Sequence, residues 1–334
     1  MLAVAEHLDT VNLPHDRKVI EGILDRSEKS FTSQCSSADC EFVFVLEDLD
    51  KKRIIGTSMI YAQHGTKRAP HIFFRVENDE RYSVTLDRYF VHQTLRIGYN
   101  YNGPTEIGGL ILLPEYRRNA HALGKALSYV RFLFMRMHRE IFRDHVLSEL
   151  LPPLETDGTS KLWEALGRQF TGLSYQEADR LSKDNKEFIH ALFPDDPIHT
   201  ELLPADVRAL IGQVGEDTRA VEKMLRRIGF EYAEQIDPFD GGPHFVAKTD
   251  DITIVRDAAE VTVRVASGDG RAWAVIGVES AVGAVGSRGD SGQTQFRAIG
   301  ARVSPISPGV VGISEDARRT LGIEDGQKVW LSYG

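Results

Sequence analysis

The spacing of apolar residues predicts a helical start to the chain, followed by paired strands. Residues 1–31 read as helix, turn and helix, with an apolar stripe at helical spacing made of Val19, Ile20, Ile23 and Leu24. Residues 42–46 are apolar on both faces, which predicts a central strand. Residues 54–61 come after a Lys-Lys turn and are expected to be its hairpin partner, with Gly56 at a bulge.

The middle of the chain continues as two strands and a long helix. Residues 71–76 and 106–113 are strand-like, and Pro114 closes the second. Residues 122–142 predict a helix because apolar residues recur at spacings of three and four, at Leu123, Leu127, Val130, Phe134, Met137 and Ile141. Strands that run into a basic turn and a long helix indicate an α/β fold.

Two further helices are predicted after this region. They cover residues 157–170 and residues 217–230, the second with Thr218 as N-cap and Gly229 as C-cap.

From residue 251 the composition changes to Gly, Ser and Val, with short strands expected at 252–255, 261–265 and 273–278. The last residues, 312–331, read as a short helix, a turn and a final strand. We therefore expect two parts: residues 1–250, and residues 251–334 as a small β-rich appendage.

The net negative charge of the chain argues against some classes of binding partner. Asp and Glu number 49 against 40 Lys and Arg, a net charge of −9. Nucleic-acid binders are normally basic, so we expect no nucleic-acid partner. An acidic protein suits a cationic small substrate.

The longest apolar stretches, such as 42–46 and 110–113, are far shorter than the ~20 residues that span a membrane. The first ten residues contain Glu6 and Asp9 and no basic, apolar leader, so we expect a cytoplasmic protein without a membrane partner. In that setting Cys35 and Cys40 are expected to be ordinary thiols. We expect no metal site, because no second pair of ligands follows them.

The most informative stretch is 110–127, in which a buried strand stops at Pro114, passes two arginines and enters a long helix. Backbone N–H groups at a helix N-terminus lack internal partners and carry partial positive charge, so they bind phosphate. Arg118 and Lys125 would reinforce that site, and the preceding strand offers backbone groups to an extended ligand.

This stretch resembles the acyl-CoA signature of the GNAT acyltransferases, in which Pro-x-Tyr-Arg precedes a Gly-rich turn and a helix. A wider similarity, to the arginine and ornithine N-succinyltransferase family, covers nearly the whole chain. The segment 236–243, Ile-Asp-Pro-Phe-Asp-Gly-Gly-Pro, is its most specific part. Other matching segments are 13–14 with 30–31, 42–48, 131–135, 188–189 with 197–200, 211–214 and 229–232.

The resemblance implies a GNAT-like mixed sheet flanked by helices. It also implies transfer of succinyl from succinyl-CoA to the α-amino group of arginine or ornithine, the start of arginine degradation. Succinyl-CoA is then a co-substrate, and no cofactor is bound permanently. The implied CoA-binding residues are Leu110, Arg117, Arg118, Ala122, Leu123, Gly124 and Lys125. A homo- or hetero-oligomer is left open.

Two departures from the family pattern affect the site. The family's catalytic histidine follows Gly-Gln-Val, and Gly215 stands in that place. Ala122 stands where the family has a glycine in the phosphate turn. Because GNAT-type transfer depends on positioning, we expect Gly215 to lower rather than abolish activity, and Gly215→His to raise turnover or shift its pH optimum.

The missing histidine leaves the catalytic residue unknown, with Glu106 and His244 as candidates. Glu106, Asp237 and Asp240 are the carboxylates available to bind a guanidinium. The alternative function is an acyl-CoA-binding protein of the same fold that has lost or changed its acyltransferase activity.

Overall fold

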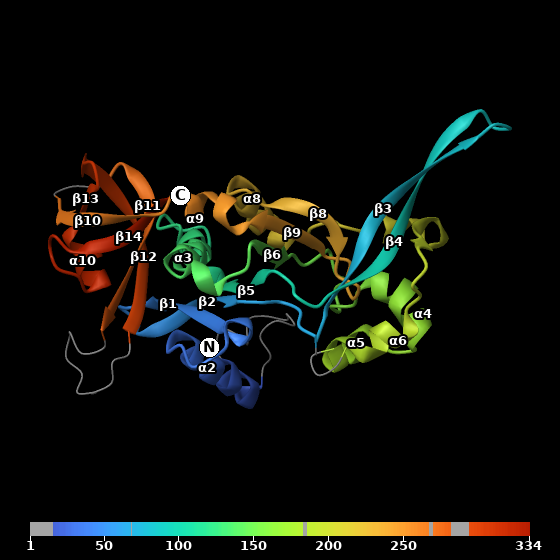
Figure 1. Ribbon diagram of the computed structural model, residues 1–334, viewed down its shortest axis with the longest axis horizontal. Helices are drawn as coiled ribbons and strands as arrows, with labels where there is room; N and C mark the ends of the chain where they lie inside the picture. Colours follow the sequence, from blue (N-terminus) through green and yellow to red (C-terminus); the bar gives the residue numbers. More distant parts are fainter. Residues whose placement is uncertain (1–15, 68, 183–185, 267–269, 282–293) are drawn as a thin grey trace. The chain divides into compact units, whose positions relative to one another are not determined.

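The computed structural model describes residues 16–67, 69–182, 186–266, 270–281 and 294–334. Contacts within the chain divide it into two units (Figure 1). The first comprises Met1–Ala62, Ile107–Asp144 and Lys248–Gly334, and the second Gln63–Glu106 and His145–Ala247. The helix and turn predicted before residue 16 lie outside the described residues.

Helices and strands alternate in the order expected of an α/β protein. The helices are α2 (Arg17–Phe31), α3 (Leu123–Met137), α4 (Arg168–Thr171), α5 (Tyr175–Ser182), α6 (Glu187–Leu192), α7 (Ala205–Arg208), α8 (Arg219–Arg227), α9 (Thr253–Arg256) and α10 (Glu315–Leu321). The strands are β1 (Glu41–Asp48), β2 (Arg53–Tyr61), β3 (His71–Ser83), β4 (Arg88–Asn100), β5 (Thr105–Leu112), β6 (His145–Glu149), β7 (Ile198–His199), β8 (Glu231–Ile236), β9 (Pro243–Lys248), β10 (Ala259–Val265), β11 (Ala272–Ala281), β12 (Thr294–Ser307), β13 (Val310–Ile313) and β14 (Lys328–Tyr333).

In the first unit, β1 and β2 form the predicted antiparallel hairpin, and β2 has β5 on its other side. The register shifts opposite Gly56, which confirms the bulge. β1 is outermost in the strand order of the described residues, so the prediction of a central strand is wrong. Its residues Phe42, Val43 and Phe44 are nevertheless buried, whereas Val45 is exposed. The hydroxyls of Ser27 and Ser30 on α2 accept hydrogen bonds from its backbone N–H groups at Val43 and Glu41.

Helix α3 carries the core of the first unit. Phe132 and Phe134 are buried, as expected of core aromatic residues. The helix ends at Met137 and not at residue 142, because the chain turns there into a short 3-10 helix. The Arg139 side chain stabilises this turn by bonding to the Phe142 carbonyl and to Asp250.

The predicted β-rich C-terminal part is a closed barrel with strand order β10-β13-β12-β11-β14 (Figure 1). Residues 252–255 are not a strand: Thr253–Arg256 forms α9, whose Ile254 and Val255 are buried. A short apolar run fits either a buried strand or a buried helical turn, so periodicity alone did not separate them. Contacts group the barrel with α3 in the first unit, and the boundary at residue 250 stays a prediction.

The second unit contains the strand order β6-β9-β8-β3-β4-β7. β3 is longer than predicted and pairs with β4 from His71↔Asn100 to Ser83↔Arg88, as a long twisted hairpin (Figure 1). Helical turns cover its core around Trp163, which starts a π-helical turn, Trp163–Gly167. The two predicted helices are present but shorter: the first is this turn with α4, and the second is α8.

Two other expectations can be compared with the structure. Cys35 and Cys40 are joined by a disulfide, so the prediction of two free thiols is wrong. Their Cα atoms are 5.8 Å apart, within the range that a disulfide bridges without backbone movement. A search of the described residues for a helix with the length and apolar character of a membrane span finds none.

Candidate functional site

The junction of β5 and α3 has the features of an anion site. Ala122, the N-cap of α3, has a left-handed backbone (φ 52°) and makes no capping hydrogen bond with its side chain. The first turn of the helix contains no acidic residue. Its N–H groups therefore present partial positive charge that no described side chain neutralises. The left-handed backbone is one that glycine adopts without strain, as the sequence-based expectation of a glycine at this place requires.

The basic side chains of this junction differ in their surroundings. Arg117 donates from Nε to the Leu112 carbonyl at 2.9 Å and so fixes the turn. Arg118 is exposed, and no described residue pairs with its guanidinium. The ammonium of Lys125 lies 4.3 Å from the centroid of the Trp273 ring, a cation–π contact. Arg118 is thus the cation most available to a phosphate.

The second unit holds a cluster of titratable residues around Glu149, the last residue of β6. The Nε2 atom of His71, on β3, is 3.2 Å from Glu149 Oε1, and that of His244, on β9, is 3.4 Å from it. His64 lies 4.0 Å from the same oxygen, and its Nδ1 is 2.6 Å from Glu106 Oε2. The structure therefore brings together both predicted catalytic candidates, Glu106 and His244.

Burial sets the protonation of this cluster. It lowers the pKa of His71 and lowers that of His244 to about 4. It opposes a charge on His64 too, but the adjacent Glu106 outweighs burial and raises the pKa of His64. Burial would raise the pKa of Glu149, yet the surrounding histidines hold it well below its usual range. Glu149 is therefore ionised, and of the three histidines His64 is the one whose pKa favours the charged form.

Asp237 and Asp240 shape the turn between β8 and β9. Asp237 Oδ1 accepts hydrogen bonds from the backbone N–H groups of Phe239 and Asp240, and Asp240 Oδ1 accepts one from Gly242. Burial raises the pKa of Asp237 to about 7 and raises that of Asp240 well above its usual range. Both carboxylates are thus weaker partners for a cation than their type suggests, and their predicted role in substrate binding stays a prediction.

Gly215 sits where no side chain fits. Its N–H donates to the Leu151 carbonyl at 2.8 Å, and a Cβ built on it would lie 2.8 Å from the Pro152 carbonyl oxygen. That oxygen belongs to the backbone, so the chain would have to shift. The side chain of Thr218 also donates a hydrogen bond to the Leu151 carbonyl. It therefore does not make the predicted capping hydrogen bond to α8.

We therefore revise the expected result of Gly215→His. The variant should lose about 1–3 kcal/mol of unfolding free energy, as overpacked sites do, and should gain no turnover. Urea denaturation and steady-state rates measure both. Glu216→His is the control, because Glu216 is exposed and accepts an imidazole without crowding. A stable Gly215→His variant with raised turnover would contradict this expectation.

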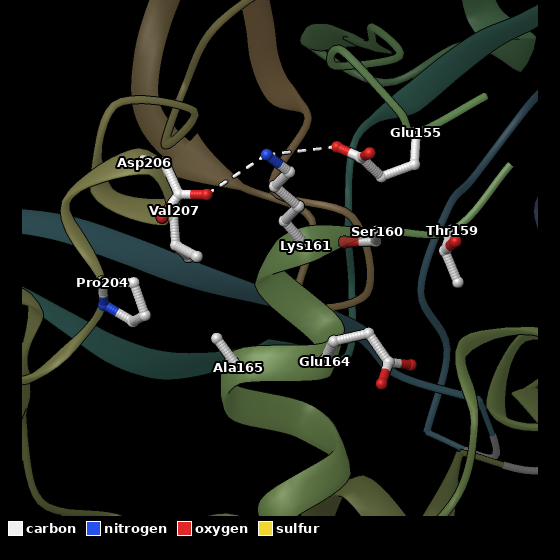
Figure 2. Close-up of a pocket in the computed structure, with 9 residues that line it drawn as sticks. All are labelled: Glu155, Thr159, Ser160, Lys161, Glu164, Ala165, Pro204, Asp206 and Val207. Atoms are coloured by element: carbon white, nitrogen blue, oxygen red, sulfur yellow. Dashed lines mark hydrogen bonds and ion pairs between the residues drawn. The ribbon is translucent and has the colours of Figure 1, made fainter. Parts of the chain in front are cut away.

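A separate shallow hollow of about 390 Å³ lies in the same unit (Figure 2). Lys161 reaches across it to Asp206 at 3.1 Å and to Glu155 at 3.2 Å. These ion pairs neutralise the lysine, and the other lining residues are Thr159, Ser160, Glu164, Ala165, Pro204 and Val207. The hollow offers no unpaired charge on Lys161 to a ligand.

The sequence did not single out His64, His71 or Glu149. They lie in a loop and on two strands that are far apart along the chain, and only the sheet brings them to His244. The signal that could have found them is the pair of histidines flanking the loop before β3.

Comparisons with known proteins identify the family of this chain. A family model described as "Arginine N-succinyltransferase beta subunit" matches residues 1–254. The arginine N-succinyltransferase of Yersinia pestis (strain Pestoides F) is 33% identical over 253 residues, which are 75% of this chain and 71% of the relative. That of Enterobacter sp. (strain 638) is 32% identical over 253 residues, 75% of this chain and 73% of the relative.

The similarity in structure extends further along the chain. The solved arginine/ornithine succinyltransferase subunit AI from Pseudomonas aeruginosa matches with a TM-score of 0.82 and 28% identity. The match covers 99% of this chain and 94% of that chain, so it includes the C-terminal barrel. It confirms the α/β fold with a mixed sheet, flanking helices and a β-rich C-terminal part.

Proposed function

Because the chain belongs to the arginine N-succinyltransferase family, we propose that it transfers succinyl from succinyl-CoA to the α-amino group of arginine or ornithine, as the first step of arginine degradation. The observation that carries this proposal is the family match over residues 1–254, which includes the junction of β5 and α3. The alternative, a protein that binds acyl-CoA without turnover, is not favoured by these relatives.

The acyl donor binds along β5 and at the start of α3. The uncapped helix terminus and the unpaired Arg118 give the pyrophosphate of CoA its positive partners. The strand supplies backbone groups for the pantetheine arm. The proposed contacts are Leu110, Arg117, Arg118, Ala122, Leu123, Gly124 and Lys125.

The acceptor is a cationic amino acid, and Glu106 is the carboxylate we propose for its guanidinium. Asp237 and Asp240 already accept backbone hydrogen bonds and have raised pKa values, so they contribute less negative charge. Glu106 is half-buried, which strengthens a charge-assisted hydrogen bond.

Aminolysis of a thioester depends strongly on the positioning of the amine, so turnover without the histidine at Gly215 is physically reasonable. The residue that takes the amine proton stays unknown, because Glu106 is proposed for the guanidinium and His244 is fully buried.

The Pseudomonas relative is named a subunit, which supports the expectation that this chain works in an oligomer. The cytoplasmic location stays a prediction.

The proposal predicts the products of a defined substrate panel. Purified protein offered succinyl-CoA or acetyl-CoA with a set of amino acids should succinylate arginine first and ornithine next, as followed by mass spectrometry. Neutral amino acids should react least, because they lack the cation that Glu106 binds. Acylation of a neutral amine with arginine untouched would refute the substrate. If CoA binds and no pair gives a product, the binding-protein alternative is correct.

A further inference from the structure

The histidines around Glu149 leave polar atoms unpaired in the interior of the second unit. His71 and His244 are buried, with exposed fractions of 3% and 0%. Both ring nitrogens of each, and Nε2 of His64, have no hydrogen-bond partner among the described residues. Buried polar atoms are normally paired, and the Nε2 atoms of these rings face the Glu149 carboxylate without a hydrogen bond of good geometry, which indicates a partner outside the protein chain.

The spacing of the atoms fits the edges of a tetrahedral metal site. Zinc lies about 2.0–2.2 Å from nitrogen and oxygen ligands, so two ligands of a tetrahedron are about 3.3–3.5 Å apart. Glu149 Oε1 is 3.2 Å from His71 Nε2 and 4.0 Å from His64 Nε2, and the partly exposed His64 side chain can move closer to that oxygen. His244 Nε2, 3.4 Å from the same oxygen, belongs to a second group with Glu149 and Asp237. The ligand atoms of His64, His71 and Glu149 all lie within 4.8 Å of one another.

The surroundings of these three residues also favour a cation. Metal-binding histidines usually donate their second ring N–H to a carboxylate, and Glu106 holds His64 Nδ1 at 2.6 Å in this way. Asp237 adds a further carboxylate whose oxygen lies within 4.8 Å of the ligand atoms of Glu149 and His244. The side chains of Glu149 and His64 are 28% and 23% exposed, which leaves a path for an ion to enter.

We propose that His64, His71 and Glu149 bind a divalent transition-metal ion, for which zinc is the first choice. Two imidazoles and one carboxylate are a donor set that zinc favours, and softer metals would prefer sulfur ligands. The whole site lies within the second unit, and the inference goes beyond succinyl transfer without depending on it. It also replaces the sequence-based expectation that the chain has no metal site.

The test uses the full-length, untagged protein after treatment with EDTA. Calorimetry with zinc should show one strong site per chain, and Co²⁺ should give the intense visible absorption of a tetrahedral complex. Added zinc should raise the melting temperature, because it binds the folded state. These readouts do not involve turnover, so they separate the metal site from the proposed function.

Substitutions test which residues bind the metal. His64→Ala and Glu149→Gln change partly exposed side chains and should each weaken zinc binding at least ~100-fold, while Glu106→Gln should weaken it ~10–100-fold. His145→Ala is the control, because His145 is exposed on the same strand as Glu149 and should leave affinity unchanged. A wild-type protein that takes up neither zinc nor cobalt overturns the proposal. Unchanged affinity in both His64→Ala and Glu149→Gln does so too.

Discussion

Replacing Phe134 by alanine should lower the free energy of unfolding by about 3–5 kcal/mol, the range for large aromatic residues removed from a core. Phe134 is 2% exposed, in the middle of α3. Its ring lies 5.0–6.1 Å from five other phenylalanine rings: Phe31, Phe42, Phe44, Phe142 and Phe296. These rings come from α2, β1, the turn after α3 and the barrel strand β12, so one cavity would loosen each of these contacts in the first unit.

Urea denaturation followed by circular dichroism measures this change. Phe90→Ala is the control, because Phe90 is 38% exposed on the β3–β4 hairpin and should cost less than about 1 kcal/mol. Phe134→Leu should fall between the two, since leucine fills part of the cavity. If Phe134→Ala and Phe90→Ala destabilise equally, the aromatic cluster is not the core of this unit.

Apolar patterning predicted several elements that are present in the structure. They are the helix α3, the β1–β2 hairpin and the barrel strands β10 and β11, whose apolar residues are close together in the sequence. Position within the sheet was harder to predict. β1 looks like a central strand because its sequence is apolar on both faces, yet it is outermost among the described strands, and two serines of α2 accept hydrogen bonds from its backbone N–H groups.

The candidate site also has a part that the sequence predicts and a part that depends on residues distant in the chain. The strand, turn and helix of the proposed phosphate site were predicted, because they are contiguous in the sequence; binding of phosphate there stays a prediction. The cluster around Glu149 was found only in part, since its members approach one another through β3, β6 and β9. The revised expectation for Gly215→His has the same origin: the carbonyl of Pro152, which crowds a side chain at this position, is distant in sequence.

Reversing the charge of the phosphate turn, by Arg118→Glu with Lys125→Glu, should weaken CoA binding at least ~100-fold. Hydrogen bonds to a charged group contribute about 1.5–3 kcal/mol, and each tenfold loss of affinity corresponds to about 1.4 kcal/mol. The new carboxylates would also oppose the partial positive charge of the α3 terminus that attracts the phosphates. Wild-type affinity should fall as salt is added, because ions screen an exposed site.

Isothermal titration calorimetry with CoA measures the effect, and Lys223→Glu with Arg227→Glu is the charge-matched control on α8. Lys125→Glu also removes the contact with Trp273, which can lower stability, so melting temperatures accompany each titration. Arg118→Glu alone avoids this complication, since Arg118 is exposed and pairs with no described residue. It should account for about half of the loss in binding free energy. Unchanged CoA affinity in both Arg118→Glu and the double variant would place the CoA site elsewhere on the protein.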